Sequence, residues 1–383
     1  MKSSPLRFAH QMCAALIAGG LLTAAVPVTL PGAHAQERCA TPLLAPPPPP
    51  NDAFTDVHRL AQGRGVHVAV IDTGVANHPE LRGVIPGADI LDPENPRPLE
   101  DCTGHGTIVA GVIGSSTYGV APGSEIISIR QSGQSGTIDG LTAAIHNAVD
   151  LGARVINVSV VACMPRGEGF DATALDEAIN RAEVSGALIV AAAGNASSQC
   201  TADSSVIPAH HPLVVAVGSS EEPYVHEDYS IPIPSNHPVR LSAPGTVSVG
   251  LSPSGEGFAS GMVTSPGSPA APFVGTSFAA PVVSGTVALM LERRPTMSPE
   301  EIRSALRSVA HPTTGRMLID DAVNEALHTP LSATALRVPP PVTPEPPAYI
   351  RRSLAFAVIV LVGATLGCMI AALIHRIRRK PNR

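Results

Sequence analysis

The fold is decided by the stretch Val66-His67-Val68-Ala69-Val70-Ile71-Asp72-Thr73-Gly74. Residues 66–71 are almost continuously apolar, which is typical of a strand that is buried on both faces in a parallel sheet. The glycine that follows predicts a turn, so we expect Asp72 at the carboxyl end of the strand. Sites are assembled at that edge in open α/β sheets. Alone, Asp72 is as consistent with a turn or a helix cap as with a catalytic group.

Outward from this strand, strand-like and helix-like segments alternate along the chain. Further strands are predicted at 125–129, 154–159, 187–193 and 213–217, and helices at 138–149, 171–185, 278–291 and 299–309. Thr137 is the expected cap of the first helix and Gly152 its end, while Ser298 opens a capping box. Pro281 is expected in the first turn of its helix. The alternation predicts an α/β fold with a mainly parallel sheet and helices on both faces.

Three further motifs place chemically useful side chains beside predicted strand ends or helix starts. His105 lies between two glycines at the start of an apolar helical run, Asn195 follows the strand at 187–193, and Ser277 follows Gly275-Thr276. A serine hydroxyl is a poor nucleophile at neutral pH and needs a histidine base oriented by a carboxylate. Singly, His105 is more simply a turn residue and Asn195 a cap.

Both ends of the chain carry predicted export and membrane signals. Residues 1–35 combine Lys2 and Arg7, an apolar run at 12–30 and a small-x-small pattern at 33–35, which favours a cleaved signal peptide over an uncleaved anchor. Residues 354–374 contain no charge and are long enough to span a bilayer, so a membrane helix is predicted at 351–375 rather than a buried soluble helix.

The predicted topology places the main domain outside the cytoplasmic membrane. Five basic residues follow the apolar run and two precede it, which favours a cytoplasmic tail at 376–383. The expected domains are an N-terminal extension at 36–65, a globular domain at 66–328 and a proline-rich spacer at 329–350. The net charge of −6 and the absence of a basic face argue against a nucleic-acid binder.

The cysteine content agrees with export. Outside the signal peptide and the membrane helix, four of the six cysteines remain, an even number in an oxidising compartment. Four cysteines allow three pairings. We favour Cys163–Cys200, because consecutive parallel strands joined by a helix bring their ends together, which leaves Cys39–Cys102. Free or differently paired thiols are the alternative.

Taken together, the motifs resemble those of the subtilisin-like serine proteases. The resemblance rests on Asp-Thr-Gly at Asp72, Gly-His-Gly-Thr at His105, Ala-Ala-Gly-Asn at Asn195 and Gly-Thr-Ser-Phe-Ala-Ala-Pro at Ser277. The order Asp, His, Ser is that of subtilisin itself. The resemblance covers about 66–327 and implies a subtilisin-like three-layer fold. It implies a triad of Asp72, His105 and Ser277, with Asn195 as oxyanion donor.

The whole architecture is similar to that of the mycosins, membrane-anchored subtilases of actinobacterial type VII secretion. This resemblance implies a peptide or protein substrate, components of the secretion membrane complex as partners, and contact with lipid through one C-terminal helix. Two alternatives stay open, a mainly structural part of a secretion complex and a general envelope-processing protease. No cofactor and no metal are expected, and a solvated loop is preferred to a cation site at Asp89, Asp92 and Glu94.

Two features depart from the subtilase pattern. Subtilases carry Ser-Leu-Gly along one wall of the primary specificity pocket, whereas this chain has Ser159-Val160-Val161. The branched Val161 is expected to narrow the site, so that small substrate side chains are preferred. The extension at 36–65 is too short for a separate globular pro-domain; we favour its wrapping the catalytic domain over its covering the cleft.

Overall fold

The computed structural model describes residues 39–49, 54–133, 136–165, 167, 169–222, 225–327 and 348–378. The predicted signal peptide at 1–35, residues 329–347 of the predicted spacer and residues 379–383 of the tail lie outside the described residues. The chain divides into two compact units, Met1–His328 and Thr329–Arg383, which are described separately.

The first unit is organised around a seven-stranded sheet whose neighbouring strands are all parallel. Its strand order is β10-β9-β7-β5-β2-β4-β3. The strands are β2 (His67–Asp72), β3 (Val84–Asp89), β4 (Glu125–Arg130), β5 (Val155–Val158), β7 (Leu188–Ala192), β9 (Val215–Ser219) and β10 (Arg240–Ala243). The predicted parallel sheet is therefore confirmed, and Asp72 is the last residue of β2.

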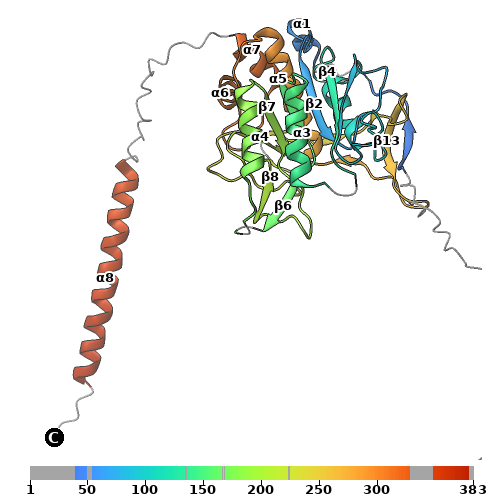
Figure 1. Ribbon diagram of the computed structural model, residues 1–383. Helices are drawn as coiled ribbons and strands as arrows, with labels where there is room; N and C mark the ends of the chain where they lie inside the picture. Colours follow the sequence, from blue (N-terminus) through green and yellow to red (C-terminus); the bar gives the residue numbers. More distant parts are fainter. Residues whose placement is uncertain are drawn as a thin grey trace, which may run out of the picture. The chain divides into compact units, whose positions relative to one another are not determined.

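Helices cover both faces of this sheet, and the alternation of side chains along β2 explains why (Figure 1). Val68 and Val70 belong to one buried core, while Ala69 and Ile71 belong to the other. The first core includes side chains of α2 (His105–Gly114), α5 (Thr276–Arg293), α6 (Pro299–Val309) and α7 (Ile319–Leu327). The second includes α3 (Ile138–Asp150) and α4 (Thr173–Val184).

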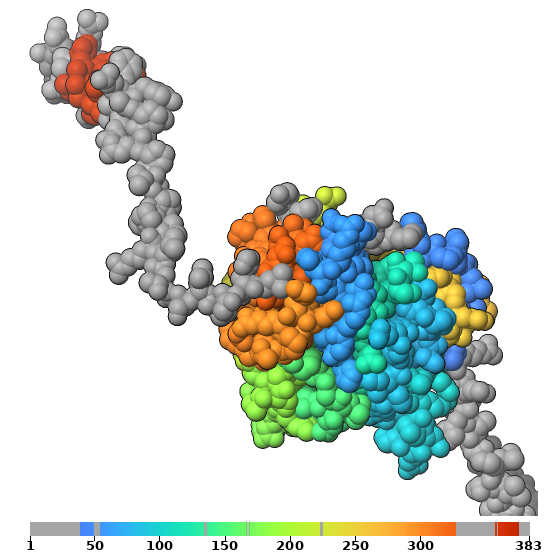
Figure 2. Space-filling model, turned by 90° about the horizontal axis from the view of Figure 1, so that it is seen from above, coloured from blue at the N-terminus to red at the C-terminus, as the bar shows by residue number. Residues whose placement is uncertain are grey.

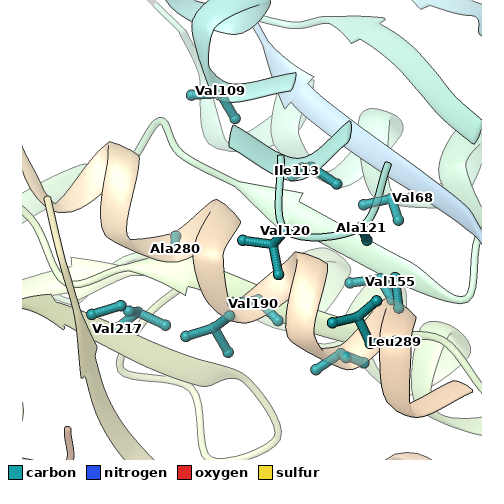
Figure 3. Close-up of a cluster of buried hydrophobic side chains, with 14 of the residues drawn as sticks. Val68, Val109, Ile113, Val120, Ala121, Val155, Val190, Val217, Ala280 and Leu289 are labelled. Carbon is teal, nitrogen blue, oxygen red and sulfur yellow. The ribbon is translucent and has the colours of Figure 1, made fainter. Parts of the chain in front are cut away.

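Helix α5 runs through the centre of the first core. Figure 3 shows Ala280 and Leu289 of this helix among valines of the sheet strands and side chains of α2 such as Ile113. All of these side chains are almost completely buried. The short helix α1 (Thr55–Leu60) contacts α7, so the blue N-terminal segment lies against the orange C-terminal helices in Figure 2.

Three small antiparallel sheets were not foreseen from the sequence. The first joins β1 (Thr41–Ala45), β13 (Phe258–Val263) and β12 (Gly250–Leu251). The second pairs β11 (Thr246–Val247) with β14 (Phe273–Val274), and the third pairs β6 (Ala162–Pro165) with β8 (Ser204–Ile207). Their strands are two to six residues long, too short for a clear period in the sequence.

Local signals at the helix ends were correct with one exception. Thr137 caps α3 by accepting from Gly140 N, and Ser298 opens α6 with a complete capping box. Gly152 has the left-handed φ of 74° that suits a helix end. The expectation for Pro281 was wrong: α5 begins at Thr276, two residues earlier than predicted, so Pro281 lies inside the helix beyond its first turn.

The described part of the N-terminal extension wraps the domain surface. Strand β1 pairs with β13, and Figures 1 and 2 show the blue N-terminal strand beside the gold β13. A disulfide joins Cys39 to Cys102, and a second joins Cys163 to Cys200. This is the pairing that the sequence favoured. The extension is thus attached three residues before His105.

The second unit contains one described element, α8 (Ala348–Arg378). Its side chains are described only at 357 and 359–374. Within the described part of the chain, no helix reaches the combination of length and apolarity that crossing a membrane requires.

Candidate active site

Buried Asp72 and partly exposed His105 form an acid–base pair at the carboxyl edge of the sheet. Asp72 ends β2 and is fully buried, and His105 is the first residue of α2. His105 Nδ1 lies 2.7 Å from Asp72 Oδ1, which also accepts from Thr73 N at 2.8 Å. An ionised carboxylate only accepts, so Nδ1 carries the proton and Nε2 is left as the basic nitrogen.

The glycine after His105 is needed for this close approach. A Cβ atom at Gly106 would lie 2.1 Å from the carbonyl oxygen of Gly74 and 3.2 Å from Asp72 Oδ1. Any side chain there would push α2 away from the end of β2. The Gly-His-Gly pattern therefore has a steric cause in the packing of the two elements.

The surroundings of His105 make it a stronger base. Burial by itself lowers the pKa of His105, but the charge of Asp72 and its hydrogen bond raise it, with a smaller contribution from Asp101. The net result is a pKa of His105 above its ordinary value. Phe278 covers the imidazole, with the two ring centroids 5.2 Å apart. The carboxylate therefore favours the imidazolium that forms when the ring accepts a proton.

Asp101 is a second buried carboxylate that holds the start of α2. Its Oδ2 accepts from Thr107 N at 2.8 Å and Thr107 Oγ1 at 2.7 Å, and its Oδ1 accepts from Thr73 Oγ1 and Gly104 N at 2.8 Å each. Burial raises the pKa of Asp101, and these hydrogen bonds oppose that rise. The Thr73 bond links the helix start directly to the residue after Asp72.

Ser277 lies in the first turn of α5, and its hydroxyl points to a backbone carbonyl. Ser277 Oγ donates to Ser159 O at 3.0 Å, and Ser159 Oγ donates to Ser277 O at 2.8 Å. Across the described residues, no hydrogen bond joins Ser277 Oγ to His105. The neighbouring residue Phe278 nevertheless touches the His105 ring, so Ser277 and His105 occupy the same edge of the sheet.

Asn195 presents its amide to the start of α5. Its Oδ1 accepts from Thr276 N at 2.9 Å and from Thr276 Oγ1 at 3.0 Å, which leaves the Nδ2 group as a donor. A Cβ atom at Gly275 would lie 2.8 Å from Asn195 Nδ2, so glycine is needed for the approach. Asn195 thus faces the turn that carries Ser277.

Val160 and Val161 line a cavity of about 220 Å³ beside Ser159. The opposite wall is formed by the segment after β4, including Gln131 and Ser132, and by Leu141 of α3. Val161 is half-buried and packs against both cores. Two of the three residues expected to bind substrate, Val160 and Val161, therefore line this partly apolar cavity, and the third, Ser159, makes the contact with Ser277 instead.

Sequence reasoning assigned no role to three residues that support the site, namely Asp101, Asn157 and Thr276. Asp101 was visible as an acid four residues before His105. Asn157 was visible as a polar residue inside an apolar strand, where it is completely buried. Such positions require a hydrogen-bond partner, but the sequence does not say which one.

Asp89, which was expected in a solvated loop, instead binds Arg130 and backbone amides within the protein.

Residues 63–330 match the family model described as the subtilase family of S8 peptidases. The chain belongs to the subtilase family. This subtilase is 34% identical over 375 residues to Mycosin-4 of Mycobacterium tuberculosis, which covers 85% of this chain and 81% of the relative. Family membership identifies it as a serine endopeptidase. The resemblance predicted from the motifs is thereby confirmed.

Solved structures give the same relationship. The crystal structure of MycP1 from the ESX-1 type VII secretion system has a TM-score of 0.67 and 30% identity, covering 79% of this chain and 92% of that one. A chain in the periplasmic assembly from the ESX-5 inner membrane complex has a TM-score of 0.68 and 29% identity, covering 81% and 94%. This subtilase thus shares its fold with proteases of such systems.

Proposed function

We propose that this subtilase hydrolyses peptide bonds with Asp72, His105 and Ser277 as its catalytic triad. Ser277 Oγ attacks the carbonyl carbon of the scissile bond while His105 Nε2 takes the hydroxyl proton. Asp72 keeps its hydrogen bond to Nδ1 and stabilises the imidazolium. His105 then gives the proton to the leaving amine, and water repeats the sequence to release the acyl group.

The observation that carries this proposal is the 2.7 Å contact between His105 Nδ1 and buried Asp72 at the sheet edge where the Ser277 helix begins. The Ser277 hydroxyl has to turn from Ser159 O to His105 Nε2 before attack. Catalytic contacts often form fully only when substrate is bound.

Asn195 Nδ2 and the Ser277 backbone amide are the proposed donors to the oxyanion. The Ser277 amide is among the first amides of α5, which have no partner inside the helix. Asn195 is held in place because its Oδ1 binds Thr276. Two fixed donors at this point stabilise charge that develops only in the transition state.

Hydrolysis by the full-length chain in detergent tests the triad directly. The wild-type protein is expected to cleave a fluorogenic peptide, and Ser277→Ala to lose at least about a thousandfold in kcat. Ser304→Ala, an exposed serine of α6, is the matched control and should keep full activity. Comparable hydrolysis by Ser277→Ala and wild type would contradict the assignment.

We propose that Val161 restricts the substrate to small side chains at the position next to the cleaved bond. Its branched side chain occupies a wall where subtilases usually have glycine, beside a cavity of only about 220 Å³. A peptide library should therefore be cleaved slowly, and mainly after small residues. Efficient cleavage after Phe or Tyr would overturn this selectivity.

The proposed location is the outer face of the cytoplasmic membrane, with one anchor at 351–375 and a cytoplasmic tail. Support comes from the uncharged sequence at 354–374 and from the basic residues that follow it. The anchor would contact lipid, and no nucleic-acid partner is proposed. Protease accessibility of tags at both ends of the chain in intact cells would test this topology.

A role in type VII secretion is proposed from the relatives, among them chains from the ESX-1 and ESX-5 systems. Presence of a relative in the ESX-5 inner membrane complex also favours a structural role for this chain beside proteolysis. Comparing Ser277→Ala with deletion separates the two roles. Secretion that survives the point change but not the deletion would make the structural role dominant.

We also propose that the N-terminal extension stabilises the domain rather than inhibiting it. Strand β1 pairs with β13, and the Cys39–Cys102 disulfide would retain the extension after any cleavage between these residues. The purified full-length protein should therefore be active before trimming. Activity that appears only after trimming would reverse this assignment.

A further inference from the structure

A row of buried polar groups leads from the middle of α5 to the backbone of the proposed nucleophile. Ser284 Oγ donates to Asn157 Oδ1 at 2.8 Å, and Asn157 Nδ2 donates to Ser159 Oγ at 2.8 Å. Ser159 Oγ in turn donates to Ser277 O at 2.8 Å. Asn157 and Ser284 are completely buried and Ser159 is 3% exposed, so these groups are shielded from water.

Pro281 explains why the Ser277 carbonyl needs this partner. In a regular helix the carbonyl of residue 277 would accept from the amide of residue 281, but proline has no amide hydrogen. The carbonyl of Ser277 is therefore left for an outside donor, and the Ser159 hydroxyl supplies it. Buried carbonyls without a partner are costly, which makes this contact a strong restraint on the turn.

Ser284 fixes which group donates and which accepts at each hydrogen bond of this row. Ser284 donates to the oxygen of the Asn157 amide, so the amide must present its NH₂ group to Ser159. A Ser159 hydroxyl that accepts from this group has its own hydrogen available for Ser277 O. Ser277 and Ser284 are seven residues apart, two helical turns, and therefore lie on the same face of α5.

A separate contact holds the other side of the same turn. Thr276 N and Thr276 Oγ1 donate to Asn195 Oδ1, and Gly194 N donates to Thr276 Oγ1 at 3.1 Å. The start of α5 is thus bound to the end of β7 through Thr276 and to the end of β5 through Ser277 O. Ser277 lies between two strand ends of the central sheet.

We propose that Asn157 and Ser284 are positioning residues for the nucleophile and act through the Ser159 hydroxyl. Their hydrogen bonds hold the Ser277 backbone at the place from which its hydroxyl alternates between Ser159 O and His105. Neither residue touches the substrate. The inference rests on the proposed role of Ser277, and it adds residues that act on the rate of its attack rather than on peptide binding.

The test compares Ser284→Ala with Thr286→Val in the full-length protein. Both changes remove a completely buried hydroxyl from α5, but Thr286 Oγ1 donates only to Val282 O within the helix. We measure the rate of inactivation by diisopropyl fluorophosphate, the kcat and KM for a peptide, and Tm. Ser284→Ala should lower both the inactivation rate and kcat about tenfold and change KM by no more than about twofold. Thr286→Val should leave the inactivation rate, kcat and KM unchanged.

Asn157→Asp provides a second variant of nearly identical shape. An ionised carboxylate cannot donate, so at a pH high enough to ionise this buried acid Ser159 must donate to it and loses its bond to Ser277 O. The inactivation rate should fall about a hundredfold for the folded fraction, which circular dichroism quantifies. The proposal is overturned if Ser284→Ala and Thr286→Val have equal rates, or if only KM or only Tm changes.

The same assay distinguishes failure of this inference from failure of the catalytic assignment. If Ser277→Ala still reacts with diisopropyl fluorophosphate, Ser277 is not the nucleophile and both proposals fall. If Ser277→Ala is inert but Ser284→Ala and Asn157→Asp react at the wild-type rate, only the positioning role is refuted.

Discussion

Asn195 serves two purposes that can be separated by two substitutions. Its Nδ2 group is the proposed oxyanion donor, and its Oδ1 accepts from the amide and hydroxyl of Thr276. Asn195→Ala removes both functions. Asn195→Asp keeps an acceptor for Thr276 but replaces the donor with a negatively charged oxygen. Asn195→Asp should therefore be the more stable of the two variants and Asn195→Ala the more active one.

The magnitudes follow from the groups lost. Loss of the corresponding donor in subtilisin, a relative of this chain, lowers turnover about 10²- to 10³-fold, and Asn195→Ala should do the same here. Asn195→Asp should be slower still, because a carboxylate repels the developing oxyanion. Loss of two hydrogen bonds at a site open to water should lower the stability of Asn195→Ala by about 1–2 kcal/mol, or Tm by about 2–6 °C.

Steady-state hydrolysis and thermal unfolding of the full-length variants test this ranking. Asn180→Ala, an exposed asparagine of α4, is the control and should change neither quantity. The reasoning is refuted if Asn195→Asp is as active as the wild-type protein. It is equally refuted if Asn195→Ala unfolds at a higher temperature than Asn195→Asp, because the Thr276 contact would then contribute nothing.

Three other changes have defined outcomes. Val161→Gly should raise the ratio of kcat/KM for a substrate with Phe before the cleaved bond to kcat/KM for one with Ala by at least about tenfold. An unchanged ratio would contradict the proposal that Val161 restricts the substrate side chain. Because Asp72 raises the pKa of His105 and the base must be unprotonated, kcat/KM should fall as pH decreases through a value above 6.5. A decrease of kcat/KM that occurs only below pH 6.5 would contradict the proposal that Asp72 raises the pKa of His105. Arg303 is buried and paired with two glutamates, so Arg303→Ala should cost about 3 kcal/mol in urea unfolding, and a loss below about 0.5 kcal/mol would refute it.

The central sheet was predictable because its strands are buried on both faces. Continuous apolar runs at 66–71 and 187–193 have few alternative structures, and the polar residues that follow them fall at the sheet edge. The two-residue strands β11, β12 and β14 carry no such signal. Strand β1 depends on pairing with β13, more than 200 residues away, a contact that local sequence does not encode.

The site was predictable at the level of residue type and less so at the level of contacts. Glycines beside His105 and Ser277 marked close approaches that the steric contacts now explain. The start of α5 was placed two residues late, with Pro281 in the first turn, where a proline is tolerated. The structure instead bonds the freed carbonyl of Ser277 to Ser159. That compensation comes from tertiary packing and leaves no local pattern.

The most direct measurement of the central claim is the site of modification by diisopropyl fluorophosphate in the full-length protein. Mass spectrometry of the digested adduct should locate the diisopropylphosphoryl group on Ser277 alone. The adduct should be absent from Ser277→Ala and form far more slowly in His105→Ala. A label on another serine, or equal labelling of the His105→Ala variant, would contradict a Ser277 nucleophile activated by His105 and Asp72.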